Sequence, residues 1–265
     1  MGMSFHVVDG IRYLTFDLFP EQVVHAVFTR QGGLSPDPWA SLNMGGTVGD
    51  ERPRVRENRF RAFRALGRDP HSMFDVWQVH SADVVVANAP HSIVPHELKA
   101  DAIITDNPAV TLFMRFADCT PILLFDPARH AVGIVHAGWL GTVRKAASAA
   151  VEAMRAAYGS NPADILAAIG PAIGPDHYEV GPDVIEKAAH AFGAEAETLF
   201  HWNGGPRPHF DLWAANRLAL RQAGLADRQI ETAGICTACN PQDWYSHRQQ
   251  KGKTGRFGAL IALRS

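Results

Sequence analysis

Residues Val110–Val135 read VTLFMRFADCTPILLFDPARHAVGIV and contain three apolar runs, Val110–Phe116, Pro121–Phe125 and Ala131–Val135. Each run has the length of a strand, and short apolar runs bounded by turn residues are typical of strands that are buried on both faces. The polar breaks between the runs are too short to hold a helix. The stretch therefore predicts successive strands without crossover helices.

The same pattern continues toward the N-terminus, where Met73–Val79, Asp83–Ala87 and Asp101–Thr105 are further runs of strand length. Strands thus follow one another from 73 to 135 with no helix between them. A doubly wound parallel sheet needs a long crossover, usually a helix, between its strands, so this succession favours antiparallel or mixed sheets with helices outside them. We expect an α+β sandwich.

The remaining elements lie on either side of these strands. Thr142 and Asp211 stand where two helices would take their N-caps, and Gly159 stands where the first of these would end. The expected helices are Arg54–Leu66, Val143–Tyr158, Val184–Phe192 and Leu212–Gln222, and the further strands are Val23–Thr29, Ile165–Ile169, Gln229–Ile235 and Ala259–Leu263.

The composition is that of a globular protein with a sizeable core. The chain has 265 residues, 46% of them hydrophobic, and no linker-like tract or repeat, so one domain over residues 1–265 is expected. A net charge of −2 without a basic stripe argues against nucleic-acid binding, and no apolar run approaches the roughly 18 residues of a membrane helix. The start lacks a signal-peptide pattern and three cysteines make no disulfide framework, so we expect a cytoplasmic protein.

Three residues at the ends of apolar runs carry metal-binding chemistry. They are His80 in a Gln-Val-His-Ser segment, Cys119 in Asp-Cys-Thr-Pro, and His136 in Val-His-Ala-Gly-Trp. Taken singly, each is as typical of a core as of a site. Together, two imidazoles and one thiolate are the ligand set of a catalytic zinc that keeps its fourth position open.

The neighbours of Cys119 allow a second interpretation. Without a metal, a thiol next to a histidine would suit a nucleophile. Asp118 beside it would either orient a ligand or act as an acid or base. Two available histidines favour the zinc hypothesis over the nucleophile.

Several segments could bind an anion or a substrate. The loop after His136 contains Gly138 and leads to the expected helix at Thr142, whose free N–H groups would attract phosphate. Arg30 and Asn43 lie in glycine-containing loops near the start, and Arg248 lies in a basic tail segment. An Arg fork suits phosphate.

Cys236 and Cys239 form a single C-x-x-C pair in the tail. One such pair supplies half of a zinc site, and no βαβ unit frames it as in thioredoxin. A structural role is favoured, with redox chemistry left open.

Taken together, these segments resemble the laccase-domain family, whose members have been called multicopper polyphenol oxidase, peptidoglycan editing factor and purine nucleoside phosphorylase. The resemblance spans nearly the whole chain. It rests on Phe-Thr-Arg-x-Gly-Gly from 28, Gln-Val-His from 78, Asp-Cys-x-Pro from 118, His-Ala-Gly-Trp from 136, Cys-Thr from 236 and Thr-Gly-Arg from 254.

The resemblance implies a two-sheet mixed β-sandwich core flanked by helices, with zinc on His80, Cys119 and His136. It implies phosphorolysis of adenosine, inosine, guanosine and methylthioadenosine to the base and a ribose 1-phosphate, with adenosine deamination beside it. Catalysis would then involve Cys119, Asp118 and His80, and small molecules would be the partners. The sequence does not indicate an oligomeric state.

Two departures from the family pattern concern the expected anion site. Leu140 stands where members commonly carry Arg, and Gln249 stands where a second Arg commonly follows Arg248. Two other functions stay open. A Cys and two His can also hold copper, although no two of the 13 histidines are spaced as His-x-His, the pattern of multicopper oxidases. A zinc-bound hydroxide or the Cys119 thiolate would also serve an amide hydrolase acting on peptidoglycan precursors.

Overall fold

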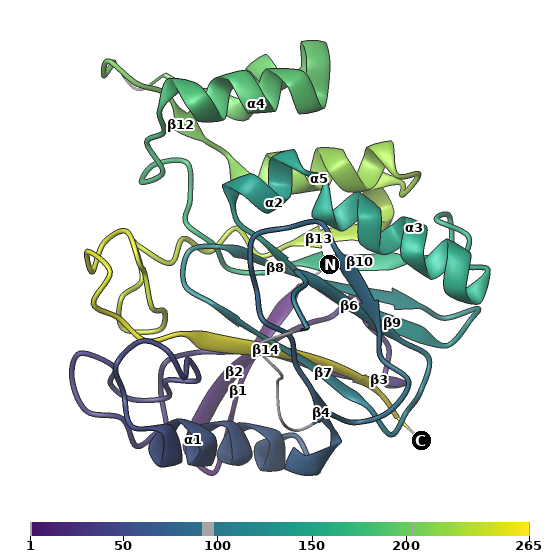
Figure 1. Ribbon diagram of the computed structural model, residues 1–265, viewed down its shortest axis with the longest axis vertical. Coiled ribbons are helices and arrows are strands. Elements are labelled where there is room, and N and C mark those ends of the chain that lie inside the picture. The colour runs from purple at the N-terminus through teal and green to yellow at the C-terminus, as the bar shows by residue number, and fades with distance from the viewer. Residues whose placement is uncertain (1, 92–97, 203, 265) are drawn as a thin grey trace.

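The computed structural model describes residues 2–91, 98–202 and 204–264. Two six-stranded sheets pack face to face at its centre (Figure 1). The first has the order β1 (Met3–Val8), β2 (Ile11–Phe16), β3 (Val23–Phe28), β14 (Phe257–Leu263), β7 (Thr111–Phe116) and β4 (Met73–Phe74). The second has the order β13 (Ile230–Thr232), β10 (Leu166–Ile169), β8 (Thr120–Asp126), β9 (Ala131–Ala137), β6 (Ala102–Thr105) and β5 (Val84–Val86). A small hairpin joins β11 (Phe200–His201) and β12 (His209–Phe210).

Both large sheets are mixed. Antiparallel pairs dominate, while β4–β7, β5–β6 and β10–β13 are parallel. This confirms the predicted α+β sandwich. The three runs of the opening stretch do not share one sheet, however. β7 ends in the first sheet at Phe116, and β8 begins in the second at Thr120. The chain therefore crosses between the sheets at residues 117–119.

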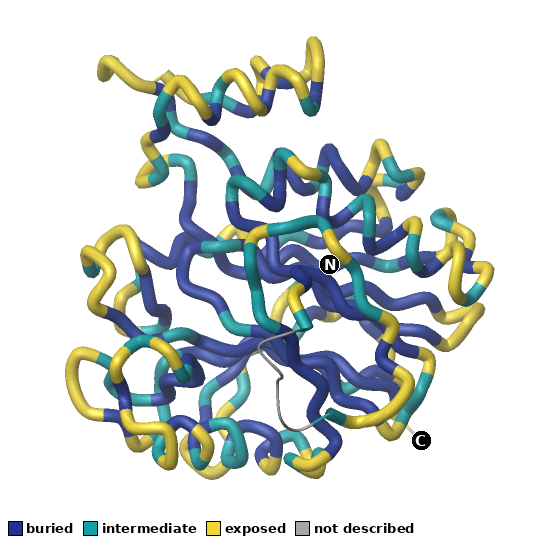
Figure 2. The backbone as a smooth tube through the Cα atoms, in the orientation of Figure 1, coloured by how far each residue is buried: buried dark blue, intermediate teal, exposed yellow. Residues whose placement is uncertain are grey.

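Side chains of the central strands alternate between two buried layers. In β8, Leu123 and Phe125 face the core between the sheets, whereas Ile122 and Leu124 face the helices outside. A strand covered on both faces has no solvent side, which explains why β8 and β9 read as continuous apolar runs. Figure 2 shows these buried strands through the middle of the molecule.

Helices cover the outer faces of the sandwich (Figure 1). α1 (Arg52–Ala65) places Ala62 and Phe63 on the first sheet, against Phe113 and Leu260. α3 (Ala146–Tyr158) and α5 (Leu212–Gln222) cover the second sheet. Beyond them, α2 (Trp139–Val143), α4 (Pro182–Phe192) and η2 (Gly193–Leu199) form a smaller cluster, and η1 (Pro70–Ser72) and η3 (Asp227–Gln229) are single turns. No described helix is long and apolar enough to cross a membrane.

The helix expected at Val143–Tyr158 begins elsewhere. α2 starts at Trp139 with Gly138 as its N-cap, and Lys145, at φ 59°, separates α2 from α3. Thr142 lies inside α2, where its hydroxyl accepts a hydrogen bond from Asn216, so it does not cap a helix. Asp211 does cap α5, because its carboxylate accepts from Ala214 N.

One further prediction was wrong, and two strands at the start of the chain were missed. Only Met73–Phe74 of the run to Val79 is a strand, because the buried Asp75 turns to the guanidinium of Arg115 and the ladder ends there. The strands β1 and β2 were not predicted. In β1 the side chains are mostly exposed, so it carries no long apolar run.

Candidate metal centre

The crossing between the sheets brings the three predicted metal ligands together. Cys119 follows Asp118, whose φ of 78° turns the chain sharply out of β7. The Cys119 Sγ lies 3.9 Å from Nε2 of His80, and the ligand atoms of His80, Cys119 and His136 all lie within 4.8 Å of one another. The sequence-based grouping therefore corresponds to one cluster in space.

Asp101 orients two of these ligands. Its Oδ1 lies 2.8 Å from Nδ1 of the buried His136, which leaves Nε2 on the other side of the ring to face Cys119. Its Oδ2 accepts from the backbone N–H groups of Val79 at 3.1 Å and Ser81 at 2.6 Å, on either side of His80. A carboxylate behind a ligating histidine is the usual support of a metal site.

The thiol and the imidazole polarise each other. Burial raises the pKa of Cys119, but the rings of His136 and His80 outweigh burial, and that pKa falls to about 6. Burial lowers the pKa of His136, but the Cys119 thiolate and Asp101 outweigh it, and that pKa rises to about 9. The two shifts favour a thiolate beside an imidazolium, and a bound metal would take the place of the imidazolium proton.

The donor set fits zinc. With a Zn–S bond of about 2.3 Å and a Zn–N bond of about 2.0 Å, a tetrahedral ion separates its sulfur and nitrogen ligands by about 3.6 Å. The distance between Cys119 and His80 is close to this value. Gly138 allows the approach, since a Cβ there would lie 2.7 Å from Cys119 Sγ and 3.2 Å from a carbon of the His80 ring.

The carboxylate of Asp118 is held from the tail of the chain. Thr237 Oγ1 donates to its Oδ1 at 2.7 Å, and the backbone N–H of Arg248 donates to its Oδ2 at 2.6 Å. Both carboxylate oxygens are thus engaged, and Asp118 is mostly buried. This arrangement suits a residue that positions Cys119.

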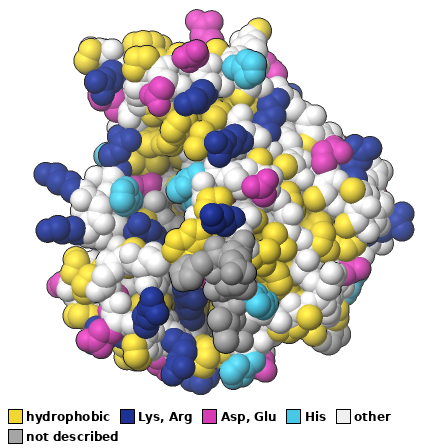
Figure 3. Space-filling view, in the orientation of Figure 1, with side chains coloured by type: hydrophobic (Ala, Val, Ile, Leu, Met, Phe, Trp, Pro, Cys, Tyr) yellow, Lys and Arg dark blue, Asp and Glu magenta, His cyan; other side chains and the backbone are white. Residues whose placement is uncertain are grey.

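A pocket of about 710 Å³ opens on the metal cluster. His80, Cys119 and His136 all line the pocket and His80 is exposed, so a metal held by them would be reachable from it. Cationic and aromatic side chains line the rest of it. The lining includes Arg52, Arg56, Arg59, Arg115, Arg256, Phe60, His71, Trp77, Gln78 and His247. Lys and Arg side chains gather over α1 in the lower part of the face in Figure 3.

Arg59 and Arg115 are two of the cationic residues that line this pocket. Both share the fully buried carboxylate of Asp75, which contacts Arg115 directly and lies 3.5 Å from Arg59. Burial and the charge of Arg115 lower the pKa of Arg59 to about 10, although Asp75 opposes this. Two guanidinium groups against one carboxylate leave net positive charge, which an anionic ligand would offset.

Known proteins resemble this chain over most of its length. The sequence model of the family described as multi-copper polyphenol oxidoreductase laccase matches residues 24–264. The chain belongs to this family. A purine nucleoside phosphorylase from Deinococcus radiodurans is 40% identical over 241 residues, which cover 91% of this chain and 89% of that protein. Purine nucleoside phosphorylase YlmD from Bacillus subtilis is 36% identical over 250 residues, covering 92% and 90%.

Solved structures of the laccase family share the fold. The crystal structure of the hypothetical protein YfiH from Bacillus licheniformis has a TM-score of 0.90 and 34% identity, over 98% of this chain and 99% of that one. The family resemblance seen in the sequence is thereby confirmed.

Within this laccase-family chain, the other predicted site residues do not line the pocket. The described residues that line the pocket do not include Arg30, Asn43, Asp118, Thr142 or Arg248. Gly138 contacts the metal ligands from behind. Leu140 and Gln249, the two departures from the family pattern, do not line it either.

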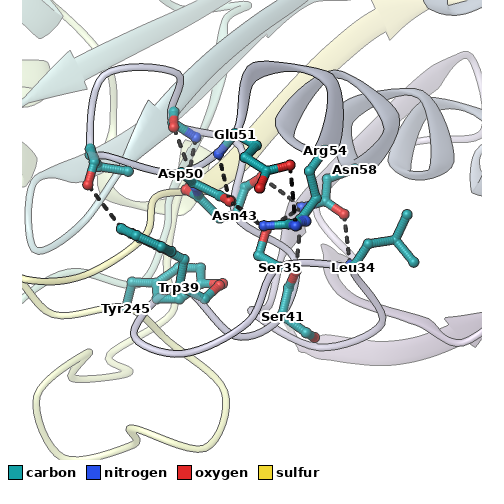
Figure 4. Close-up of polar contacts among 12 residues, drawn as sticks. Leu34, Ser35, Trp39, Ser41, Asn43, Asp50, Glu51, Arg54, Asn58 and Tyr245 are labelled. Carbon is teal, nitrogen blue, oxygen red and sulfur yellow. Dashed lines mark hydrogen bonds and ion pairs between the residues drawn. The ribbon is translucent and has the colours of Figure 1, made fainter.

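Asn43 belongs to a buried polar network beside the pocket (Figure 4). Its Nδ2 donates to Asp50 at 3.0 Å, and its Oδ1 accepts from the backbone N–H groups of Gly45 and Arg256, both at 2.9 Å. Because Gly45 and Arg256 line the pocket, Asn43 shapes its wall through the backbone.

The two arginines chosen from the sequence are engaged with the protein. Arg30 donates to the carbonyls of Ala40 and Pro241 and stacks over Tyr245. Arg248 donates to the carbonyl of Glu179 and lies over Tyr178. Phosphate binding by either residue stays a prediction that no contact here supports.

Sequence reasoning missed the carboxylate of Asp101 and the pocket arginines. Asp101 begins an apolar run, and a charged residue at the start of such a run was the sequence signal that could have indicated its role. Arg59 lies in a helix rich in arginine, where a solvated surface is the ordinary expectation. Their roles depend on contacts between segments far apart in the chain.

Proposed function

We propose that this chain is a zinc-dependent purine nucleoside phosphorylase. Its substrates would be adenosine, inosine, guanosine and methylthioadenosine, and its products a free base and a ribose 1-phosphate. The observation that carries the proposal is one pocket in which the metal ligands His80, Cys119 and His136 lie together with several arginines. The names of the relatives from Deinococcus radiodurans and Bacillus subtilis support it.

The pocket supplies the parts that phosphorolysis needs. A phosphate oxygen forms a bond to C1′ of the ribose while the bond from C1′ to the purine nitrogen breaks, and the base leaves with that electron pair and takes up a proton. Zinc, when bound, supplies a Lewis acid beside the reacting oxygen. Arg59 and Arg115 would hold phosphate through charge-assisted hydrogen bonds. Trp77 and Phe60 offer apolar surface for a purine.

His80, Cys119 and His136 would hold the metal in this proposal, and Asp118 would hold the loop that carries Cys119. Adenosine deamination belongs to the same proposal: water would form a bond to C6 of the adenine ring while the bond from C6 to the amino group breaks, and ammonia would leave to give inosine. With one thiolate among three ligands, a bound Zn²⁺ would keep one net positive charge at its open position, which favours an anionic partner there.

The test is incubation of the purified protein with adenosine and inosine, with and without phosphate, followed by mass spectrometry of the products. Free base and ribose 1-phosphate are expected only with phosphate, and inosine from adenosine is expected without it. Cys119→Ala and His80→Ala should lose the zinc of this pocket and both activities together. His190→Gln, a change at an exposed histidine of α4, is the matched control and should keep both.

The same experiment separates the alternatives. No turnover from protein shown to hold zinc would overturn the proposal and favour amide hydrolysis of peptidoglycan precursors. Copper in the metal analysis, with oxidation of a phenol, would favour the polyphenol oxidase that the family description names. Full activity in a zinc-free variant would exclude the metal from the mechanism.

A further inference from the structure

A second cluster of metal-binding side chains lies apart from the pocket. His177, Cys236 and Cys239 place their ligand atoms within 4.8 Å of one another. Nδ1 of His177 lies 3.8 Å from Cys236 Sγ and 3.4 Å from Cys239 Sγ. These distances bracket the separation of about 3.6 Å between sulfur and nitrogen ligands of a tetrahedral zinc.

The backbone builds this cluster from two distant segments. Cys236 pairs with Ala172 in an isolated parallel bridge, and Thr237 N donates to Ala172 O at 3.0 Å. The chain then turns over residues 237–239, which brings Cys239 back beside Cys236. On the other segment, His177 N donates to Gly174 O at 3.0 Å. A C-x-x-C turn with a distant histidine is a known way to deliver zinc ligands.

The environment of Cys236 is prepared for a sulfur ligand. The backbone N–H of Gly174 donates to its Sγ at 3.2 Å, a contact that stabilises negative charge on sulfur. A side chain at Gly174 would crowd this site, because its Cβ would lie 3.1 Å from Cys236 Cβ and 3.0 Å from the ring of Trp213. Glycine here lets the donor reach the thiol.

We propose that His177, Cys236 and Cys239 form a second zinc site, distinct from the centre at Cys119. His177 and Cys239 are exposed, so the fourth position faces solvent and would take a water molecule. Two thiolates neutralise the charge of Zn²⁺, whereas the first centre has one thiolate. The second site therefore has no excess charge to attract an anion, unlike the first centre.

The site also braces the first centre. Thr237 follows Cys236 directly and donates to Asp118, the residue before Cys119. A metal that fixes the turn at Cys236 would also fix Thr237, whose hydroxyl holds the loop that carries Cys119.

Metal stoichiometry tests the proposal, with the full chain loaded with zinc under reducing conditions and then cleared of loosely held metal. Wild type should retain two equivalents. Cys239→Ser and His177→Gln should each retain one, and Cys119→Ala should also retain one. His177→Gln guards against misfolding as the cause of metal loss, because the side chain of His177 is exposed. His190→Gln is the matched control and should retain two equivalents of zinc.

Sulfur coordination identifies which site remains. X-ray absorption of Cys119→Ala should report a zinc with two sulfur ligands, and that of Cys239→Ser a zinc with one. Two outcomes would overturn the proposal. One is a single equivalent of zinc in wild type after reduction. This outcome also counts for protein in which Cys236 and Cys239 were joined in a disulfide when it was recovered and were reduced before loading. The other is a second equivalent that survives in both Cys239→Ser and His177→Gln.

Discussion

Asp101 holds His136 from behind, with its Oδ1 2.8 Å from the Nδ1 of that ring. The second oxygen of the same carboxylate fixes the backbone around His80. Because the carboxylate is fully buried, neither contact is exchanged with water. One acidic group thus sets the orientation of two candidate metal ligands that lie far apart in the sequence.

Asp101→Asn should weaken zinc binding at the first centre about 10- to 100-fold. The amide keeps one acceptor but turns an N–H₂ group toward either the ring or the backbone donors, so one set of contacts is lost. Competition with a chromophoric chelator measures the change. Asp83→Asn, at an exposed carboxylate nearby, should leave the affinity unchanged. Equal affinities for both variants would show that the ligands need no support from Asp101.

Arg56→Ala should raise the KM for phosphate roughly three- to tenfold, about 1 kcal/mol, with little change in kcat. Arg56 is an exposed residue of α1 that lines the pocket, so it adds attraction for an anion without touching the metal ligands. Steady-state kinetics at varied phosphate check this. Arg64→Ala is the control on the same helix, because Arg64 pairs with Glu57 outside the pocket. A matching rise in both variants would assign the effect to net charge alone.

The parts of the fold that the sequence predicted are those with strong local patterns. β8 and β9 are buried on both faces, so their apolar runs are continuous and their positions could be predicted. β1 has mostly exposed side chains and gives no such signal. The break at Lys145 could not be predicted, because the left-handed conformation of a lysine is imposed by the packing of α2 and α3.

The same distinction holds for the site. His80, Cys119 and His136 could be predicted because few residue types bind zinc and all three stand at the ends of apolar runs in the sequence. The cationic pocket could not, because chain pattern alone does not distinguish Arg59, which lines it, from Arg30, which holds loops together. Only the folded chain shows which guanidinium groups face the metal ligands.

Thr237→Val should destabilise the protein by about 1–3 kcal/mol and lower activity. Valine keeps the shape of the buried threonine but removes the hydroxyl that donates to Asp118, so a buried carboxylate oxygen loses its partner. Urea unfolding measures the free energy. Thr237→Ser keeps the hydroxyl and should restore much of the loss, while Thr198→Val, at an exposed threonine, should cost little.

The pH profile of Thr237→Val separates two roles for Asp118. If Asp118 positions Cys119, kcat falls while the shape of the profile stays that of wild type. A profile whose limbs shift with the variant would instead indicate that Asp118 acts as an acid or base.

His25 should make the protein lose stability on acidification. Burial lowers its pKa from 6.5 to about 4, and its Nε2 accepts a hydrogen bond from Phe16 N at 2.8 Å, which requires the neutral ring. At pH values between these two pKa values, His25 is protonated in the unfolded chain and neutral in the folded chain. The stabilisation is therefore complete above pH 6.5 and falls by up to about 3 kcal/mol as the pH drops toward 4.

His25→Gln should flatten this part of the profile, because glutamine can accept from Phe16 N without titrating. Urea unfolding of both proteins at a series of pH values from 7 to about 4 gives the difference directly. His190→Gln removes an exposed histidine and should follow wild type throughout. If His25→Gln loses stability as steeply as wild type when the pH falls, the acid sensitivity arises elsewhere. The next cause to test is then protonation of the ligands of the first metal centre.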